Sequence, residues 1–449
     1  MTLDGDTPLT RHRCQMLKTR ARLFERNPFL INVLFRCAIA LAGACGSVSA
    51  LAAPDLALLR LSGQKDPAEF KCPSLKSRPS AERATAERAS QVEGDVQSGA
   101  LAPGPQVNAQ PNALKIGLWG DSHTASGTFA DNMLEALRLP VAQTHPSFLA
   151  PTFGLKGVRQ PLRRACLSDD WQLAMAYRTP KEGPENYAKS LSAIHTEQAG
   201  AFLWLDFRYP DPRTRLLWAD IHLAQDPADR ALVLGVTVDD GPESMVQFGP
   251  GSRPRLRVQS EQPFATLKLR VVAGAMRIDG IAPVYEGKTQ VILDVFSIPG
   301  ATAKGWRVVS PAHLRREDPL AHGYDVVILQ SGTNESLDPD FKVGLYEQQI
   351  SASLSQLKAA YPRARCILIG PPDAQRSSNT LRLINDSQYR LAVAKGCAHW
   401  HWQKAMGGPG AAQRWQAKGW MQADLLHLTP EGYAQSARSF VSVVPIKPR

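Results

Sequence analysis

The tetrapeptide Gly120-Asp121-Ser122-His123 places a hydroxyl side chain in a turn that could present it as a nucleophile. It lies between the apolar segment 114–119, which predicts a strand, and residues 129–139, which predict a helix. A serine in such a turn lies at the carboxyl end of a parallel strand, beside backbone N–H groups. The tetrapeptide is weak evidence by itself, because Asp and Ser also cap helices and Gly also marks ordinary turns.

Asp424 and His427 have the spacing of a base and the carboxylate that orients it. Thr429 as N-cap and Pro430 as the first helical residue predict a helix directly afterwards, so His427 belongs to the preceding loop. Asp424 can accept the Nδ1 proton of His427, which leaves Nε2 free to take a proton from Ser122. The sequence therefore predicts that Ser122, Asp424 and His427 form a catalytic triad for acyl transfer.

The pentapeptide Ser331-Gly332-Thr333-Asn334-Glu335 follows the apolar run 326–330, which predicts another strand. Gly332 allows the chain to leave that strand sharply, so the Asn334 amide can donate a hydrogen bond at the same sheet edge as Ser122. Such a donor suits the oxyanion that forms during acyl transfer. Each motif often arises by chance, but their order and their shared position at strand ends argue for a single site.

These segments together resemble the sequence blocks of the SGNH, or GDSL-like, hydrolase superfamily. The resemblance covers roughly residues 114–150 and 295–440. It implies an α/β domain with a flavodoxin-like, three-layer arrangement around a parallel sheet. It also implies a lone glycine whose N–H faces the oxyanion, and Gly300 is the best match. The implied oxyanion pocket consists of Ser122, Gly300 and Asn334.

Within the superfamily, the nucleophile block, a β-rich insert and the Gly-Thr-Asn-Glu sequence are similar to those of bacterial periplasmic peptidoglycan O-acetylesterases. The resemblance implies a carbohydrate-binding-module-like insert and an acetylated glycan as substrate. No long apolar stripe indicates a lipid channel, which favours acetyl-sized esters. Two alternatives stay open: a polysaccharide O-acetyltransferase that uses the same triad, and a catalytically silent glycan-binding or scaffold protein.

The elements that must position these residues are strands and helices in alternation. The runs 326–330 and 366–370 are nearly continuous in apolar residues, as expected of strands buried on both faces. Between them lies a helical pattern that Pro362 ends, with apolar positions at Leu345, Ile350, Leu354, Leu357 and Tyr361. A strand, helix and strand in this order predict a right-handed crossover and a parallel sheet.

The middle of the chain shows a different pattern, with short strands separated by Pro, Gly and Asp. The segments are 201–209, 216–223, 232–238, 255–258, 266–272 and 290–296. Such repetition predicts an all-β, antiparallel sandwich inserted into the α/β domain. We therefore expect a first part of the hydrolase domain at 112–160, the inserted sandwich at 161–294, and the second part at 295–449.

Residues 1–52 have the pattern of a signal peptide or membrane anchor. Basic residues precede the apolar stretch 29–41, and small residues follow up to Ala52. We expect a protein that is periplasmic or otherwise exported, with cleavage near Ala52. An uncleaved anchor or lipidation at Cys45 would instead associate the chain with the cell envelope or inner membrane. Residues 53–111 predict a largely disordered linker, because the sequence from Asp66 to Pro111 is rich in Ala, Ser, Pro, Gln and Glu and has scarcely an apolar cluster.

The cysteines fit an oxidising compartment. Of seven cysteines, four follow the expected cleavage site, and among these Cys366 and Cys397 could form a disulfide. No Cys-x-x-Cys occurs, and the sequence His399-Trp400-His401 alternates like a strand, so we expect no metal site. The predicted chemistry requires no cofactor.

The net charge of +11 is a modest excess for this length. Basic residues are spread over loops such as 159–164 and 253–257 without interleaved aromatic residues. This pattern favours a solvated surface, with some attraction to anionic cell-wall polymer, and not a nucleic-acid partner.

Overall fold

The structure is a computed structural model, which describes residues 56–61, 72, 112–178, 187–224, 231–250, 255–316, 320, 323–444 and 446. The predicted signal peptide or anchor lies outside the described residues, as does most of the predicted linker. The described residues form a parallel sheet flanked by helices and two further β-sheets. None of the helices formed by these residues is long and apolar enough to cross a membrane.

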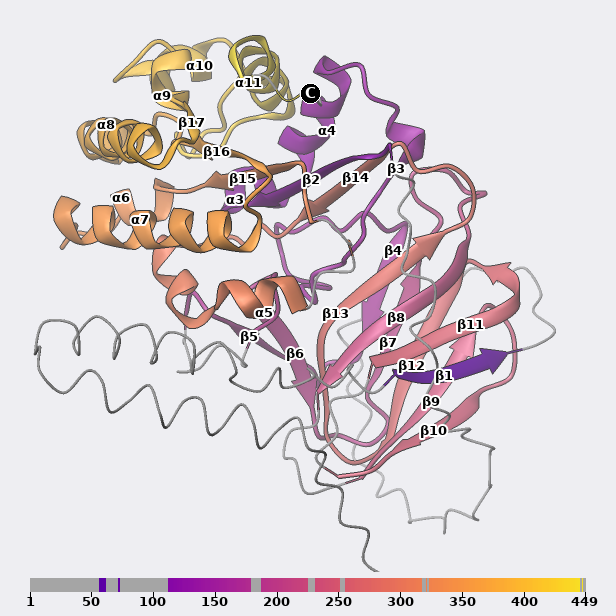
Figure 1. Ribbon diagram of the computed structural model, residues 1–449. Helices are drawn as coiled ribbons and strands as arrows, with labels where there is room; N and C mark the ends of the chain where they lie inside the picture. Colours follow the sequence, from indigo (N-terminus) through magenta and orange to yellow (C-terminus); the bar gives the residue numbers. More distant parts are fainter. Residues whose placement is uncertain are drawn as a thin grey trace, which may run out of the picture. The chain divides into compact units, whose positions relative to one another are not determined.

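The parallel sheet has the strand order β17-β16-β15-β2-β14-β3, and its neighbouring strands all pair in parallel (Figure 1). The strands are β2 (Leu114–Trp119), β3 (Thr144–His145), β14 (Val291–Val295), β15 (Val326–Gln330), β16 (Arg365–Ile369) and β17 (Ala398–Trp400). β14 and β3 lie on one side of β2, and β15 to β17 lie on the other. The carboxyl end of β2 is therefore a topological switch point, where open α/β sheets bind ligands.

Helices cover both faces of this sheet, which gives three layers. One face packs against α4 (Thr128–Ala136), α9 (Trp402–Ala405), α10 (Ala411–Ala417) and α11 (Pro430–Val443). The other packs against α7 (Val343–Ala360) and α8 (Ser378–Lys395). In β15, Val326 and Ile328 face the first group, whereas Val327 and Leu329 face the second. Burial of each such side chain stabilises the fold by about 1.5–3 kcal/mol, which explains the continuous apolar runs.

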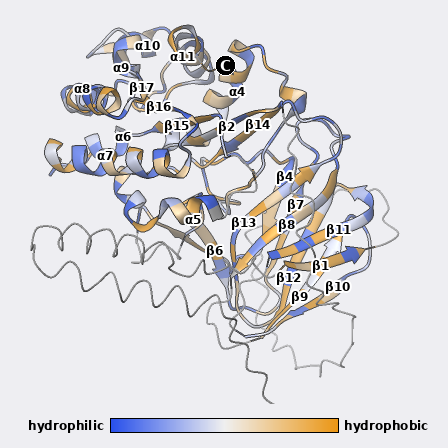
Figure 2. Ribbon diagram, in the orientation of Figure 1, coloured by the Kyte–Doolittle hydropathy of each residue, from blue (hydrophilic) through white to orange (hydrophobic). Residues whose placement is uncertain are grey.

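The two further sheets pack face to face as a sandwich with an apolar core. Their strand orders are β1-β11-β8-β13-β6-β5 and β10-β9-β12-β7-β4. The strands are β1 (Leu56–Leu61), β4 (Arg164–Leu167), β5 (Gln172–Met175), β6 (Ser192–Thr196), β7 (Phe202–Asp206), β8 (Leu216–Ala224), β9 (Leu232–Val238), β10 (Ser244–Phe248), β11 (Arg255–Phe264), β12 (Thr266–Ala273) and β13 (Met276–Tyr285). Apart from β1, they pair antiparallel. Figure 2 shows hydrophobic and hydrophilic residues in alternation along these strands, as one-sided burial requires.

The prediction that residues 290–296 belong to the inserted sandwich is wrong. Val291–Val295 forms β14, which pairs in parallel with both β2 and β3 inside the α/β sheet. A short apolar run looks the same in a sandwich core and in a buried parallel strand, because both bury it on all sides. The sandwich strands of the insert therefore end at Tyr285, and β14 opens the second part of the hydrolase domain.

The prediction of a linker over residues 53–111 is wrong for Leu56–Leu61. This segment forms β1, which pairs in parallel with β11 at the edge of the sandwich. Five of its six residues are apolar, but the run is short and its partner strand is distant in sequence, so the pairing could not be read from the neighbouring residues. A disulfide joins Cys72 to Cys166, which lies in the sandwich strand β4. The predicted pairing of Cys366 with Cys397 is confirmed.

A buried ion pair joins the insert to the parallel sheet. Lys189, in the segment between β5 and β6, is fully buried, and its Nζ lies 2.9 Å from the Tyr324 hydroxyl and 3.7 Å from Asp294 Oδ2. Asp294, in β14, also accepts hydrogen bonds of 2.6 Å from the hydroxyls of Ser147 and Tyr324. Buried charges are tolerated only when they are paired and hydrogen-bonded. The network therefore fixes β14, the strand that leads to Gly300.

Candidate active site

The turn after β2 is held by hydrogen bonds to a neighbouring strand. Asp121 is the N-cap of α3 (Ser122–Ala125) and accepts a 2.9 Å hydrogen bond from the His123 N–H. The Asp121 N–H donates to Gln330 Oε1 at 2.9 Å, and Gln330 Nε2 donates to Asp121 Oδ2 at 3.0 Å. Gln330 ends β15, so these two bonds fix the nucleophile turn to the adjacent strand.

The same turn leaves no room for a side chain at Gly120. A Cβ atom there would lie 2.2 Å from Thr124 Oγ1 and 2.8 Å from Gln330 Oε1. The chain can therefore turn sharply from strand into helix directly before Ser122. As the first residue of α3, Ser122 has an N–H without an acceptor in the helix, so this group can serve a ligand.

The structure brings the predicted triad residues together. His427 Nε2 lies 3.1 Å from Ser122 Oγ, and His427 Nδ1 lies 2.7 Å from Asp424 Oδ2. Asp424 Oδ1 also accepts the backbone N–H groups of Leu426 at 3.0 Å and His427 at 2.9 Å. Partial burial acts to raise the pKa of Asp424, but the hydrogen bonds from His427 and Leu426 lower it overall. The carboxylate is therefore ionised at neutral pH and orients the imidazole.

A second histidine lies against the first. The His123 ring is buried, with its centroid 5.5 Å from that of His427, and its Nδ1 lies 3.2 Å from the Tyr433 hydroxyl. Burial lowers the pKa of His123 to about 4, and the nearby His427 acts in the same direction, whereas Asp121 opposes it. His123 is therefore uncharged at neutral pH and places no positive charge beside His427.

Lowering the pH from 7 to 4.5 is expected to reduce the free energy of unfolding. Burial lowers the pKa of His123 and His145 from 6.5 to about 4, and that of His399 to about 3. Between these values and 6.5 the unfolded chain binds more protons than the folded chain. The free energy of unfolding therefore has its full value above pH 6.5 and decreases as the pH is lowered. The shift at His123 corresponds to on the order of 3 kcal/mol. Urea unfolding at a series of pH values measures how the free energy of unfolding changes with pH.

His399→Gln provides the comparison for this experiment, because it removes one of the titrating groups and should flatten the slope. An unfolding free energy that stays constant between pH 7 and 5 contradicts the prediction.

The predicted oxyanion donors lie on three segments that are hydrogen-bonded to one another. Gly300, with φ +84°, lies in the loop after β14, where Ile298 N–H donates to Gly120 O at 3.0 Å. On the other side, Asn334 in α6 (Thr333–Ser336) donates from Nδ2 to Ala301 O at 2.9 Å. One amide hydrogen of Asn334 is thereby engaged and the other is available to a ligand. The loop that carries Gly300 is thus held between the nucleophile turn and Asn334.

Sequence reasoning missed two buried residues of this site. The sequence predicts Gln330 as the end of an apolar strand and Glu335 as the last residue of its motif, without a role in the site for either. Both side chains are almost fully buried and hydrogen-bonded to site loops. A polar residue that ends a strand of wholly apolar residues was the available signal for Gln330.

The two histidines with metal-like spacing bond to the protein itself. His399 Nε2 lies 3.3 Å from Gln388 Oε1, and His401 Nδ1 accepts the Lys404 N–H at 3.2 Å. Within the described residues, no group of three or more His, Cys, Asp or Glu could hold a metal ion.

Comparison with known proteins locates a family domain in the second half of the chain. Residues 277–435 match the model of the GDSL-like Lipase/Acylhydrolase family. This range contains Gly300, Asn334, Asp424 and His427, and it begins after Ser122. The comparison with curated proteins found no match.

Several solved structures are similar to this chain. One described as "Peptidoglycan O-acetylesterase in action, 5 min" has a TM-score of 0.58 and 20% sequence identity, covering 74% of this chain and 91% of that chain. The salicylyl-acyltransferase SsfX3 from a tetracycline biosynthetic pathway has a TM-score of 0.30 and 13% identity, covering 64% and 95%. A family two carbohydrate esterase from Cellvibrio japonicus has a TM-score of 0.24 and 8% identity, covering 62% and 96%.

Only the first of these likenesses is close enough to support an argument, and at this identity it concerns the fold. The chain therefore contains a GDSL-like lipase/acylhydrolase domain over residues 277–435, and it shares its fold with the solved structure described as a peptidoglycan O-acetylesterase.

Proposed function

We propose that this hydrolase is an exported esterase that removes O-acetyl groups from a cell-envelope glycan, with peptidoglycan as the favoured substrate. The observation that carries the proposal is the hydrogen-bonded series from Ser122 Oγ to His427, 3.1 Å, and from His427 to Asp424, 2.7 Å. The fold likeness to a structure described as a peptidoglycan O-acetylesterase supports the choice of substrate.

The first step forms an acetyl-enzyme. Ser122 Oγ attacks the acetyl carbonyl carbon while its proton passes to His427 Nε2, and Asp424 stabilises the resulting imidazolium. The oxyanion receives hydrogen bonds from the N–H groups of Ser122 and Gly300 and from the Asn334 amide. When the intermediate collapses, His427 gives the proton to the departing sugar oxygen, and the acetyl group stays on Ser122.

The second step releases acetate. His427 takes a proton from a water molecule, whose oxygen attacks the acetyl carbon, and the proton then returns to Ser122 Oγ. A sugar hydroxyl in the place of water would make the protein an O-acetyltransferase. The reaction needs no cofactor in either case.

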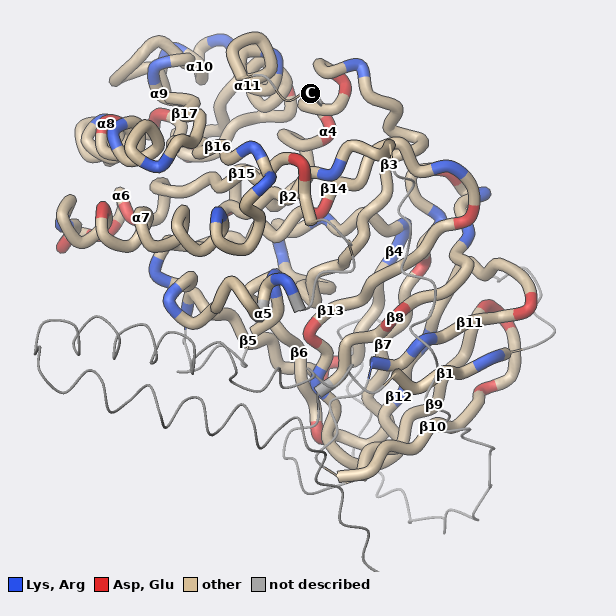
Figure 3. The backbone as a smooth tube through the Cα atoms, in the orientation of Figure 1, with Lys and Arg blue, Asp and Glu red and all other residues tan. Residues whose placement is uncertain are grey.

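We also propose that the inserted sandwich contacts the glycan and that the chain works outside the cytoplasm. Figure 3 shows Lys and Arg interspersed with Asp and Glu along the described chain. Within the sandwich, Arg257 pairs with Asp220 and Arg270 pairs with Glu243. Such a mixed surface suits a polar polymer better than a nucleic acid. The disulfides Cys72–Cys166 and Cys366–Cys397 and the pattern of residues 1–52 support export.

Acetate release from defined polymers tests the proposed function. Purified protein is incubated with O-acetylated peptidoglycan, acetylated xylan and an acetylated cellulose-like polymer, and we expect the fastest release from peptidoglycan. If acetate is released from another polymer and not from peptidoglycan, that polymer replaces peptidoglycan as the proposed substrate. Transfer from an acetyl donor to unacetylated glycan, without release into water, identifies a transferase instead.

Two inexpensive measurements accompany this assay. A serine-reactive fluorophosphonate should label Ser122, and an adduct located on any other residue contradicts the proposed nucleophile. The p-nitrophenyl ester of acetate should be hydrolysed faster than that of octanoate, and the opposite order would indicate a lipid substrate.

A further inference from the structure

Glu335 is a buried carboxyl group that the proposed reaction does not use. It follows Asn334 in α6, and its side chain is almost fully enclosed. Its Oε1 accepts a hydrogen bond of 2.9 Å from the Ala303 N–H and one of 3.1 Å from the Ser331 hydroxyl. A buried polar group with two partners is costly to remove, so its contacts constrain the segments that provide the donors.

Two consecutive residues of α6 hold the same short segment, which follows Gly300 directly. Asn334 Nδ2 donates to Ala301 O at 2.9 Å, and Glu335 Oε1 accepts from Ala303 N–H at 2.9 Å. Ala303 begins the 3₁₀ helix η3 (Ala303–Val308), whose extended N-cap residue is Thr302. The orientation of the Gly300 N–H therefore depends on where α6 holds residues 301–303.

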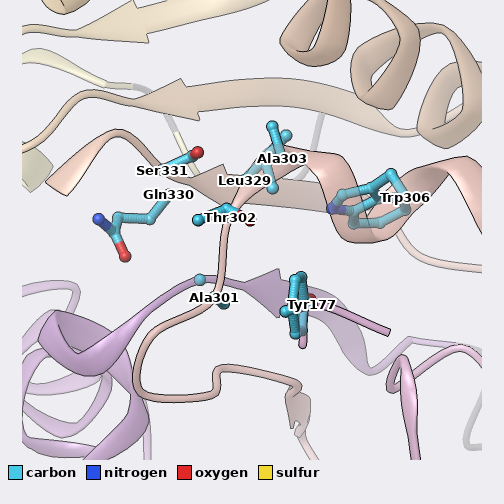
Figure 4. A pocket seen from close by; sticks show the side chains of 9 residues that line it. Tyr177, Ala301, Thr302, Ala303, Trp306, Leu329, Gln330 and Ser331 are labelled. Atoms are coloured by element: carbon cyan, nitrogen blue, oxygen red, sulfur yellow. The ribbon is translucent and has the colours of Figure 1, made fainter. Parts of the chain in front are cut away.

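The opposite side of this segment is closely packed. Figure 4 shows Ala301, Thr302 and Ala303 between the end of β15 and Tyr177, with Trp306 beside them. A Cβ atom at Gly305 would lie 2.4 Å from the Tyr177 ring. The cavity that remains between these residues has a volume of about 10 Å³, roughly the space of one water molecule. The segment is thus confined on one side by packing and held on the other by α6.

The role of Glu335 in these contacts is that of a hydrogen-bond acceptor. Burial raises the pKa of Glu335, and the charge of Asp121 adds to this, although the hydrogen bonds from Ala303 and Ser331 oppose it. Its second oxygen, Oε2, is buried and has no hydrogen-bond partner among the described residues. Both contacts use Oε1 as an acceptor, so neither of them requires a charge on the side chain. Glutamine has the same shape and the same acceptor.

We propose that Glu335 is a positioning residue of the oxyanion pocket, which holds the Ala303 N–H so that Gly300 and Asn334 donate to the same substrate oxygen. This inference rests on the proposed function, because it requires an oxyanion that forms at Ser122. The contact acts on the transition state and not on the bound ester, so its loss should lower kcat and leave KM nearly unchanged.

The test compares Glu335→Gln with Glu335→Met, and exposed Glu261→Met in the sandwich is the control. Hydrolysis of p-nitrophenyl acetate is measured per active site, with sites counted by fluorophosphonate labelling. We expect Glu335→Met to lose about 10- to 100-fold in kcat with KM changed by less than about threefold. Glu335→Gln should keep most of the wild-type kcat, because it retains the acceptor.

A second variant removes the donor in place of the acceptor. Ala303→Pro deletes the N–H that Glu335 accepts, and proline is tolerated at the first position of a helix after an extended residue such as Thr302. It should lower kcat in the same direction as Glu335→Met. This variant keeps the inference testable if Glu335→Met does not fold.

The outcomes separate the inference from the proposed function. Wild-type kcat per labelled site in Glu335→Met or Ala303→Pro overturns the inference, as does an equal loss in Glu335→Gln and Glu335→Met. In the Asn334→Ala background, Glu335→Met should lower kcat by a smaller factor than in the wild type, because both residues act on the same substrate oxygen. If the two factors simply multiply in the double variant, the inference is contradicted. Retained activity in Ser122→Ala overturns both proposals.

Discussion

Purified Ser122→Ala protein is expected to hydrolyse acetyl esters at least about 10⁴-fold more slowly than the wild type. Ser122 Oγ is placed 3.1 Å from His427 Nε2 at the switch point of the parallel sheet, where it can lose its proton and attack. Its removal abolishes the acetyl-enzyme and leaves only the contribution of the oxyanion pocket and substrate binding. Initial rates with p-nitrophenyl acetate measure the effect.

Ser126→Ala is the matched control for this experiment. Ser126 lies at the other end of the same short helix, and its hydroxyl is hydrogen-bonded to Thr128. It should retain nearly wild-type turnover. Comparable turnover in Ser122→Ala and Ser126→Ala would show that another group is the nucleophile, whatever the geometry of the triad.

Asn334→Ala is expected to lower kcat by about 10²- to 10³-fold, equivalent to about 3–4 kcal/mol of transition-state stabilisation. The amide has one hydrogen engaged with Ala301 O, which leaves the second hydrogen for a ligand. The substrate carbonyl carries little charge before attack, so KM should change little. Steady-state kinetics on an acetyl ester separates kcat from KM.

Asn334→Asp is the comparison that isolates donation from packing. It preserves the shape of the side chain but replaces the donor with a carboxylate, which repels an oxyanion. We expect at least as large a loss as in Asn334→Ala. Activity close to the wild type in Asn334→Asp would contradict the role of this residue as a donor.

The candidate site was largely predictable because its parts are encoded locally. Asp424 and His427 are three residues apart in one loop, so a short segment determines their hydrogen bond. Ser122 and Asn334 each follow an apolar run that ends at a glycine-containing turn. Parallel strands share one carboxyl edge, and therefore side chains at the ends of β2 and β15 meet without further information.

Assignment of strands to sheets was harder to predict, because a strand's partners are distant in sequence. The pattern of short strands predicted that residues 290–296 belong to the sandwich, whereas β14 pairs with β2 and β3. It also left Leu56–Leu61 in a linker, although β11 pairs with this segment. Strand β13 (Met276–Tyr285) was not predicted, and its central Pro283 and Gly280 obscure the strand pattern.

By itself, the sequence determined the kinds of groups in the site and the turns that present them, because local steric and hydrogen-bonding preferences act within a few residues. Only the tertiary structure decided which buried polar groups support those turns. Gln330 meets Asp121 across 209 positions of sequence, and Glu335 meets Ala303 across 32. Such contacts form only when packing excludes water from both partners, because each buried polar group must then find its hydrogen-bond partner within the protein.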